Sequence, residues 1–496
     1  MKSRNRSMVP RVRDTESGQS FVLVLLMLVV LLSVAALAVD MGSVYYCYQD
    51  LKSTTQSAAL AGGGAIARLT DAQAVADQFS GQTASDYNFH PNLNVAPNSV
   101  TAVVQVGCVS PATYPNFGIM PCGVYGPNNG NAVQVTESTR VPTFFAKIFG
   151  VRSVPLSATA VASATGGPGS PWNVALVVDT TASMSTGDPA CGGISRIQCS
   201  MNGVQTLLKS MTPCLAGSAC TTANSIDNVS LFTFPNITSA SAPADYCGGG
   251  NNVSVQPYTF PSSTPTSAGY APGANPTYQI LGYGNDYQIS PVPKAGPALS
   301  GSSNMSKSAG AGSCNGLKNP GGAGTYYAGV IYAAQASLMQ RQLANPNTQN
   351  AMIILSDGDA TATKSDMAAT ATATGLYPSY NDECQQAVTA AATATALGTR
   401  VYTVAYGVVP NQSGTCTSDQ KSASNPTGTN ITACQTIQAM GGGANSAYFY
   451  SDANSTGAGC NAGKNTATSL NNIFLEIGAT FKNARLLPSN MVFTAN

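Results

Sequence analysis

The sequence predicts an α/β protein whose larger part is built on a doubly wound, mainly parallel sheet, preceded by a transmembrane helix and a small α+β module. Three observations predict this arrangement. An uncharged apolar run occupies residues 21–39, short β-branched runs occupy residues 99–164, and strand-like runs alternate with helical runs from residue 172 onward. Alternating strands and helices favour a parallel sheet with a ligand site at the carboxyl ends of its strands.

The first predicted element is the apolar run FVLVLLMLVVLLSVAALAV, which is long enough to cross a bilayer as a helix. Five basic residues precede it: Lys2, Arg4, Arg6, Arg11 and Arg13. Because cytoplasmic flanks carry the excess of Lys and Arg, we expect a single-pass inner-membrane protein with a cytoplasmic N-terminus and its bulk in the periplasm or outside the cell. A cleaved secretory signal is the alternative, but the run is longer than a usual signal core and no clean A-x-A site follows.

The residues after the run predict a helical stalk and then a small α+β module. Ala, Leu and Gln favour helix to about Phe79, and small residues at 58–64 provide either a helix-packing face or a flexible break. The module is predicted from the runs VTAVVQV, AVQV, VPTFFAKIFG and VPLSATAVASA. GGPGSP then supplies a Gly- and Pro-rich linker.

The larger domain is predicted from five strand-like runs: NVALVVD, VSLFTF, AMIILSD, RVYTVAYG and AYFY. Helical stretches lie between several of them. A long Gly-, Ser-, Pro- and Asn-rich segment does not fit this alternation, so we expect a surface insertion there. The predicted domains are a basic cytoplasmic tail (1–20), a transmembrane helix (21–39), the stalk and module (40–165), a linker (166–171) and the main domain (172–487) with an insertion at about 236–320.

Composition excludes several functions. Charged residues make up 9% of the chain and the net charge is +1, so no strong field attracts nucleic acid. The single histidine, His90, leaves little material for His-based acid/base chemistry, and neither a Walker motif nor an HExxH motif is present. We therefore expect a protein that is not an enzyme.

Thirteen cysteines without CxxC pairs favour an oxidising compartment over a zinc site. The odd number leaves one thiol that is free or joined to another chain, and Cys47 is the candidate. Candidate bridges are Cys108 with Cys122, Cys416 with Cys434, Cys384 with Cys434 as an alternative, and Cys247 with Cys314 around the insertion.

Oxygen-bearing side chains follow two of the predicted strands. Asp179, Thr181 and Ser183 form a D-x-T-x-S loop after the first strand, Thr325 begins a helix after a Gly-rich turn, and Asp357 follows IILS. These hard donors suit Mg²⁺, or Mn²⁺ or Ca²⁺, and the strand order predicts that they converge. The alternative is a structural loop, because the same side chains also hydrogen-bond backbone groups.

Two parts of the chain resemble known families. The order GQSFVLVLLMLVVLLSVAALAVDMGSVYY, LKSTTQSAALA, FFAKIFGV and VPLSATAVA resembles the N-terminal region of TadG-like Tad (Flp) pilus-assembly proteins. Leu23 stands where prepilin peptidase substrates, counted from Gly18, carry glutamate, so the helix is expected to remain an anchor.

The D-x-T-x-S loop with its two later residues resembles the metal-ion-dependent adhesion site of von Willebrand factor type A domains, with Thr181 replacing the first serine. That resemblance implies a Rossmann-like type A domain. It also implies that Thr181, Ser183 and Thr325 contact the metal directly, while Asp179 and Asp357 act directly or through water. The closing run LNNIFLEIGATFKNARLLP is similar to the end of such domains in TadG-like proteins.

These observations predict a non-enzymatic, membrane-anchored component of Tad/Flp-type pilus assembly or anchoring. We expect its protein partner to be a pilus or secretion-machinery component that offers an acidic side chain to the metal. The alternative is a surface adhesin that binds an external protein or matrix ligand. Deletion of the protein distinguishes the two functions, because loss of an assembly component abolishes the filaments, whereas loss of an adhesin abolishes only attachment.

Overall fold

The structure is a computed structural model of the chain. It describes residues 17–67, 71–110, 113, 119, 122, 130–165, 171–214, 225–237, 246–247, 251–252, 277–289, 298–312, 314–318, 324–367, 371–407, 414–452, 460–465, 467–488 and 490–495. The predicted cytoplasmic tail up to residue 16 and most of the predicted linker lie outside these residues. The chain forms two compact units, one made of residues 1–57, 77–103 and 136–159, the other of residues 58–76, 104–135 and 160–496.

The first unit is organised around the long helix α1 (Ser17–Ala67). The large apolar side chains between Phe21 and Val39 are 52–69% exposed, and the helix is long and apolar enough to cross a membrane, as predicted. Farther along, Cys47 and Leu51 pack with Val100 and Val141 in a small apolar cluster. Glu137 is buried in this unit and accepts hydrogen bonds from the Thr54 and Thr55 hydroxyls at 2.5 and 3.0 Å.

A five-stranded sheet with the order β12-β3-β2-β1-β13 contains the strands predicted for the α+β module. Its strands are β1 (Thr101–Cys108), β2 (Ala132–Pro142), β3 (Ser153–Ser163), β12 (Arg485–Leu487) and β13 (Thr494–Ala495). The two C-terminal strands pair antiparallel with β3 and β1. Short helices η1 (Pro91–Leu93) and η4 (Ala146–Phe149) lie in the connections before β1 and between β2 and β3.

The helix α1 continues without a break through the small residues at 58–64, which excludes the flexible break. These residues form a helix-packing face instead. The short helix α2 (Ala72–Gln78) approaches Gly62 so closely that a Cβ there would lie 3.0 Å from the Ala76 Cβ. Here the absence of a side chain permits the close contact.

The second unit contains a six-stranded sheet with the order β11-β10-β9-β4-β5-β8. Its strands are β4 (Trp172–Asp179), β5 (Asp227–Ile237), β8 (Thr277–Gly284), β9 (Gln349–Ser356), β10 (Arg400–Ala405) and β11 (Phe449–Ser451). The pairs β4/β5, β4/β9, β9/β10 and β10/β11 are parallel, whereas β5/β8 is antiparallel. All eight residues of β4 are buried, which explains the continuous apolar run in its sequence.

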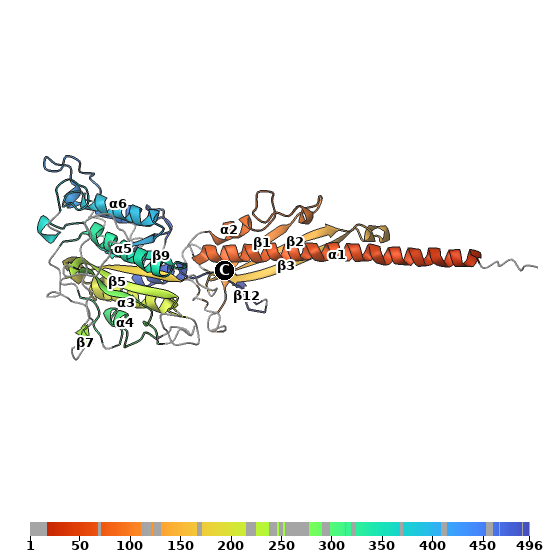
Figure 1. The fold of residues 1–496 in the computed structure, drawn as a ribbon, viewed down its shortest axis with the longest axis horizontal. Coiled ribbons are helices and arrows are strands. Elements are labelled where there is room, and N and C mark those ends of the chain that lie inside the picture. Colours follow the sequence, from red (N-terminus) through yellow and green to blue (C-terminus); the bar gives the residue numbers. More distant parts are fainter. Residues whose placement is uncertain are drawn as a thin grey trace, which may run out of the picture. The chain divides into compact units, whose positions relative to one another are not determined.

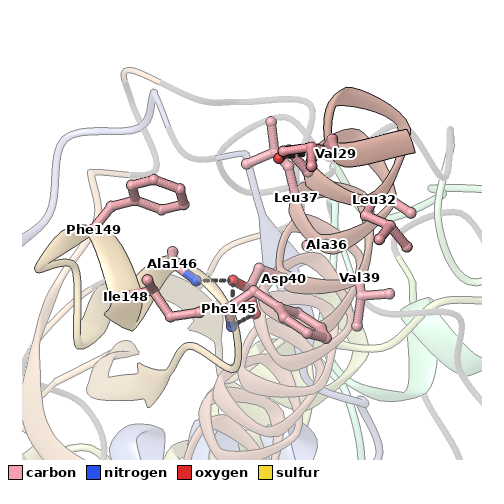
Figure 2. Close-up of a pocket in the computed structure, with 12 residues that line it drawn as sticks. Val29, Leu32, Ala36, Leu37, Val39, Asp40, Phe145, Ala146, Ile148 and Phe149 are labelled. Atoms are coloured by element: carbon pink, nitrogen blue, oxygen red, sulfur yellow. Dashed lines mark hydrogen bonds between the residues drawn. The ribbon is translucent and has the colours of Figure 1, made fainter. Parts of the chain in front are cut away.

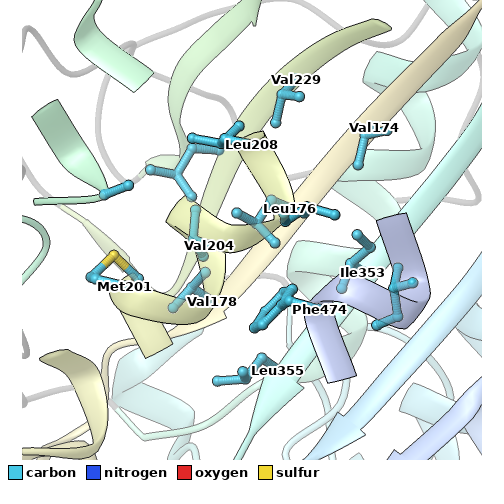
Figure 3. Packing of buried hydrophobic residues seen from close by; sticks show 14 of the residues in the cluster. Val174, Leu176, Val178, Met201, Val204, Leu208, Val229, Ile353, Leu355 and Phe474 are labelled. Atoms are coloured by element: carbon cyan, nitrogen blue, oxygen red, sulfur yellow. The ribbon is translucent and has the colours of Figure 1, made fainter. Parts of the chain in front are cut away.

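Helices cover this sheet on both sides, with α3 and α4 on one side and α5 and α6 on the other (Figure 1). They are α3 (Arg196–Ser210), α4 (Asn304–Ser308), α5 (Tyr327–Ala344), α6 (Glu383–Ala396), α7 (Ala433–Met440) and α8 (Leu470–Thr480). One apolar cluster joins β4 and β9 to α3 and α8 (Figure 3). A second cluster joins the sheet to α5, α6 and α7. Smaller elements are η5 (Ala182–Ser185), η6 (Pro189–Cys191), η9 (Lys364–Asp366), η10 (Thr417–Asp419) and the paired strands β6 (Tyr246–Cys247) and β7 (Asn251–Asn252).

The predicted fold class is wrong. We expected a doubly wound, mainly parallel, Rossmann-like sheet of the von Willebrand factor type A kind. The chain instead combines an antiparallel sheet with a mixed one. The error has two physical sources. First, β8 lies within the segment interpreted as an insertion and pairs antiparallel with β5. Second, the C-terminal strands β12 and β13 pair with strands of the N-terminal module.

Disulfides confirm one of the predicted pairs, Cys108–Cys122. Two alternatives for Cys434 are wrong, because the bridges are Cys384–Cys416 and Cys434–Cys460. A further bridge joins Cys191 to Cys199. Cys314 is disulfide-bonded, but the side chain of Cys247 lies outside the described residues, so their predicted pairing stays a prediction. Cys47 is a free, buried thiol, as expected for the odd cysteine.

Candidate functional site

The predicted metal ligands lie at the carboxyl ends of two neighbouring strands. β4 ends at Asp179 and β9 ends at Ser356, one residue before Asp357. These strands are parallel and in register, with Val178 opposite Leu355. Their ends therefore meet at one edge of the sheet, and both carboxylates are buried there.

A chain of hydrogen bonds joins four of the predicted ligands. The Thr181 hydroxyl donates to Oδ1 of Asp179 at 2.6 Å and lies 2.9 Å from Oγ of Ser183. The Ser183 hydroxyl donates to Oδ1 of Asp357 at 2.7 Å. The D-x-T-x-S loop and the residue after β9 thus form one polar cluster, as their positions after the strands predicted.

Backbone and neighbouring groups fix the loop. The Thr181 N–H donates to Oδ1 of Asp179 at 2.8 Å, and the Ser356 hydroxyl donates to its Oδ2 at 2.6 Å. The loop then forms η5, whose Met184 is buried in the apolar cluster beside α3. Both carboxylate oxygens of Asp179 therefore accept hydrogen bonds from the protein itself. These bonds hold the loop in place, which is the structural alternative to metal binding considered from the sequence.

Thr325 reaches the neighbouring loop through its backbone. It is buried just before α5, and its carbonyl accepts hydrogen bonds from the N–H groups of Thr361 at 3.0 Å and Ala362 at 3.3 Å. Two residues later, the Tyr327 hydroxyl donates to the Gly358 carbonyl at 2.6 Å. Side-chain contacts among the described residues thus join four of the five predicted ligands, and Thr325 lies on the adjoining segment.

Arg196, the first residue of α3, also belongs to this cluster and was not predicted from the sequence. Its Nη1 lies 2.7 Å from Oδ2 of Asp357 in a part-buried ion pair. Gly407 makes room for the guanidinium, because a Cβ there would lie 2.5 Å from its Cζ. The signal was a cation at a helix N-terminus, where the helix dipole disfavours positive charge and an anionic partner is therefore expected.

The electrostatics of the cluster follow from burial and like charges. Burial raises the pKa of Asp179 to about 7, and the nearby Asp357 carboxylate acts in the same direction. Burial also raises the pKa of Asp452 to about 6, which the Asp188 charge raises and the Arg196 charge lowers. Arg196 therefore lies in an acidic environment, where it neutralises part of the negative charge.

Two other groups of potential ligands do not have the same chemistry. Asp188 lies with Cys191 and Cys199, and Asp359 lies with Cys384 and Cys416. Within each group the two cysteines form a disulfide with each other. Because metal binding by cysteine requires the thiolate, neither group is a thiolate site.

Comparisons with known families concern the N-terminal part of the chain. Residues 18–74 match the family model described as Flp pilus-assembly TadE/G-like, and residues 49–162 match the one described as Tad-like Flp pilus-assembly. The N-terminal region is Tad-like. No curated protein sequence matches the chain.

Solved structures similar to the chain include two pilus proteins. The SpaC pilus adhesin of Lactobacillus rhamnosus GG, in its open conformation, is 13% identical with a TM-score of 0.31, over 80% of this chain and 35% of SpaC. The PilB minor pilin of Streptococcus sanguinis is 10% identical with a TM-score of 0.29, over 70% of this chain and 74% of PilB. The chain thus spans about a third of the length of SpaC.

The Tad-like region supports a pilus-related, structural role. A pilus-assembly family implies protein partners. Together with the apolar part of α1, the Tad-like match indicates membrane anchoring.

Proposed function

We propose that this Tad-like protein is an inner-membrane component of Tad/Flp pilus assembly whose second unit binds a protein partner through a divalent cation. The observation that carries the proposal is the hydrogen-bonded chain from Asp179 through Thr181 and Ser183 to Asp357, at the carboxyl ends of β4 and β9. It concentrates two carboxylates and two hydroxyls on one buried edge of the sheet.

The donor set fits Mg²⁺, Mn²⁺ or Ca²⁺. Carboxylate and hydroxyl oxygens are the hard ligands that these ions select. A divalent charge would also relieve the repulsion between the Asp179 and Asp357 carboxylates, which share a low-dielectric environment. Thr325 is the proposed fifth ligand, because its backbone is bonded to the loop that follows Asp357.

The partner is proposed to offer an acidic side chain. Two carboxylates balance the charge of a divalent ion, and the hydroxyls are neutral, so an open coordination position would remain attractive to a further carboxylate. Arg196, already bonded to Asp357, adds positive charge beside that position. A divalent ion with an open position and the nearby Arg196 charge together favour an anionic partner side chain over a neutral one.

The proposed topology places the N-terminus in the cytoplasm and the chain after Asp40 outside it. The basic residues before α1 support this orientation, since cytoplasmic flanks are enriched in Lys and Arg. The disulfides of the described residues all follow α1 in the chain, and such bonds persist in oxidising compartments.

Metal titration of the purified chain tests the cation. We expect Mn²⁺ or Mg²⁺ to raise the melting temperature relative to EDTA and to give a saturable calorimetric signal, both lost in Asp179→Ala. The matched control is Asp286→Ala, which removes an exposed carboxylate bonded to the Ser303 hydroxyl. An Asp179→Ala response equal to that of the control would show that the loop is structural.

The role in assembly is tested in cells. Deletion of the protein, and Asp179→Ala expressed at the normal level, should both abolish pilus filaments. Intact filaments that no longer attach would instead favour the adhesin alternative. Protease protection in spheroplasts, with tags at either end, tests the orientation separately.

A further inference from the structure

The turn between β2 and β3 presents an unusual apolar surface. Its residues 144–151, here called the apolar tip, include five large side chains that face solvent. Their exposed fractions are 56% for Phe144, 43% for Phe145, 76% for Ile148, 82% for Phe149 and 49% for Val151. An exposed apolar cluster of this kind marks an interaction surface.

The apolar tip and α1 together form a groove. Its volume is about 510 Å³, and its lining runs along α1 from Val29 to Asp40 and continues through Phe145, Ile148 and Phe149 of the tip (Figure 2). The helix side of the groove belongs to the apolar run that is long enough to span a bilayer. The eleven helical steps from Val29 to Asp40 correspond to about 17 Å along the helix axis.

Asp40 attaches the apolar tip to the helix. The N–H groups of Phe144 and Ala146 each donate to its carboxylate at 2.6 Å, and that of Phe145 donates at 3.0 Å. Asp40 itself is buried under the tip. The acidic side chain that ends the apolar run is thus enclosed by three backbone donors.

Other backbone donors of the tip are also bonded internally. The N–H of Ile148 donates to the Phe145 carbonyl, that of Gly150 to the Lys147 carbonyl, and that of Val151 to the Ala146 carbonyl, at 3.0–3.1 Å. Irregular backbone can leave water only where its polar groups find such partners. These internal bonds lower the cost of moving this part of the loop from water toward lipid.

Charged and aromatic residues indicate where the interface lies. Lys147 in the tip and Arg152 just after it are exposed, and their long side chains can extend to lipid headgroups. Beyond Asp40, Tyr45 and Tyr46 are 65% and 57% exposed on α1. Tyrosine is enriched where membrane spans leave the bilayer, so the interface is expected near these residues.

We propose that the apolar tip inserts into the outer half of the bilayer beside α1, with phospholipid acyl chains filling the groove. Bilayer lipid is the occupant that fits, because the groove is continuous with the membrane-spanning run and exposed cations neighbour its lining residues in the sequence. The inference rests on the membrane anchoring in the proposed function, and on neither the metal nor the partner. The tip would fix the depth and rotation of the helix, which a single span alone leaves free.

Tryptophan fluorescence of the full chain in vesicles tests this proposal. The one native tryptophan, Trp172, is buried in the second unit and gives a constant background. We would place a reporter by Phe149→Trp or, independently, Ile148→Trp, and use Leu376→Trp, 75% exposed in the second unit, as the matched control. The vesicles would contain phosphatidylethanolamine and phosphatidylglycerol, with and without bromine on the acyl chains.

Acyl-chain bromine should quench the Phe149→Trp and Ile148→Trp reporters at least about twofold more than the Leu376→Trp control, at any protein-to-lipid ratio. Equal quenching of reporter and control in chains that still float with the vesicles would overturn the inference while leaving the anchor intact. Shielding from bromine that increases with protein density would also overturn it, and would identify a second copy as the occupant. Chains that fail to float would refute the anchoring itself.

Discussion

The guanidinium of Arg196 lies 2.7 Å from Oδ2 of Asp357, while Oδ1 of the same carboxylate accepts a hydrogen bond from Ser183. One carboxylate thus connects an internal cation to the hydroxyl chain of the candidate metal site. Because Arg196 and a bound divalent ion would repel each other, this ion pair should set the affinity of the site.

Replacing Arg196 by methionine should therefore strengthen cation binding. Removal of one positive charge from a partly buried site is expected to tighten Mn²⁺ binding by roughly three- to tenfold in titration calorimetry. Arg196→Lys keeps the charge and is the matched control, with an affinity near that of the wild type. Equal affinities for the two variants would contradict this electrostatic role.

Thr181 separates the metal-binding and structural roles of the loop. Thr181→Ser retains the hydroxyl and should leave Mn²⁺ affinity within about threefold of the wild type, whereas Thr181→Val removes a proposed ligand and should abolish the signal. Thr181→Val also loses the bond to Asp179, at a cost of about 1–3 kcal/mol of unfolding free energy. If Thr181→Val bound Mn²⁺ normally, the hydroxyl would not be a ligand.

Glu383 should make the stability of the second unit depend on pH. Burial raises its pKa to about 9. An unfolded glutamate ionises near pH 4.3, so above about that pH the unfolded state releases a proton that the folded state retains. The contribution of Glu383 to the unfolding free energy therefore falls as pH rises toward 9, by up to about 1.4 kcal/mol per pH unit.

Glu383→Gln removes this titration and keeps an acceptor for the Ala362 N–H. The variant should gain stability relative to the wild type on going from about pH 5 to about pH 8, as measured by thermal unfolding across that range. Parallel stability curves for the two proteins would show that the buried carboxyl does not hold its proton.

The contact between α3 and α8 depends on Gly203. A Cβ at this position would lie 2.4 Å from Cδ2 of Phe474, so Gly203→Ala should lower the unfolding free energy by about 1–3 kcal/mol through overpacking. Gly64→Ala in α1 is the control, since no atom of the described residues lies within 4 Å of its Cβ position. That change should instead stabilise the helix by about 0.5–1 kcal/mol. Matching effects at both positions would argue against the close packing.

Local sequence patterns predicted the elements of the second unit better than their connections. The run NVALVVD is most of β4 and AMIILSD most of β9, because strands buried on both faces are apolar throughout. β8 was missed since TYQILGYG lies among Gly- and Pro-rich residues that indicated a loop. Pairings across hundreds of residues, such as Leu487 with Val161, leave no local pattern at all.

The candidate site was predictable to the extent that it follows from strand ends. Asp179 and Asp357 terminate adjacent strands, so their proximity followed from the expected strand order, and the mixed topology preserves that adjacency. The ion pair with Arg196 was not foreseen, because it depends on how α3 packs and on the space beside Gly407. The predicted pairing of Cys416 with Cys434 was wrong for a similar reason: proximity along the chain favoured it, whereas the packing of α6 brings Cys384 to Cys416.

Cys47 has a consequence for experiments on assembly. As a thiol that is 3% exposed in the cluster with Leu51 and Val100, it is shielded from alkylating reagents while the helix and strands of the first unit stay packed. Maleimide would therefore label Cys47 only when α1 separates from the strands that it packs against. The rate of labelling would report this separation in living cells without an introduced probe.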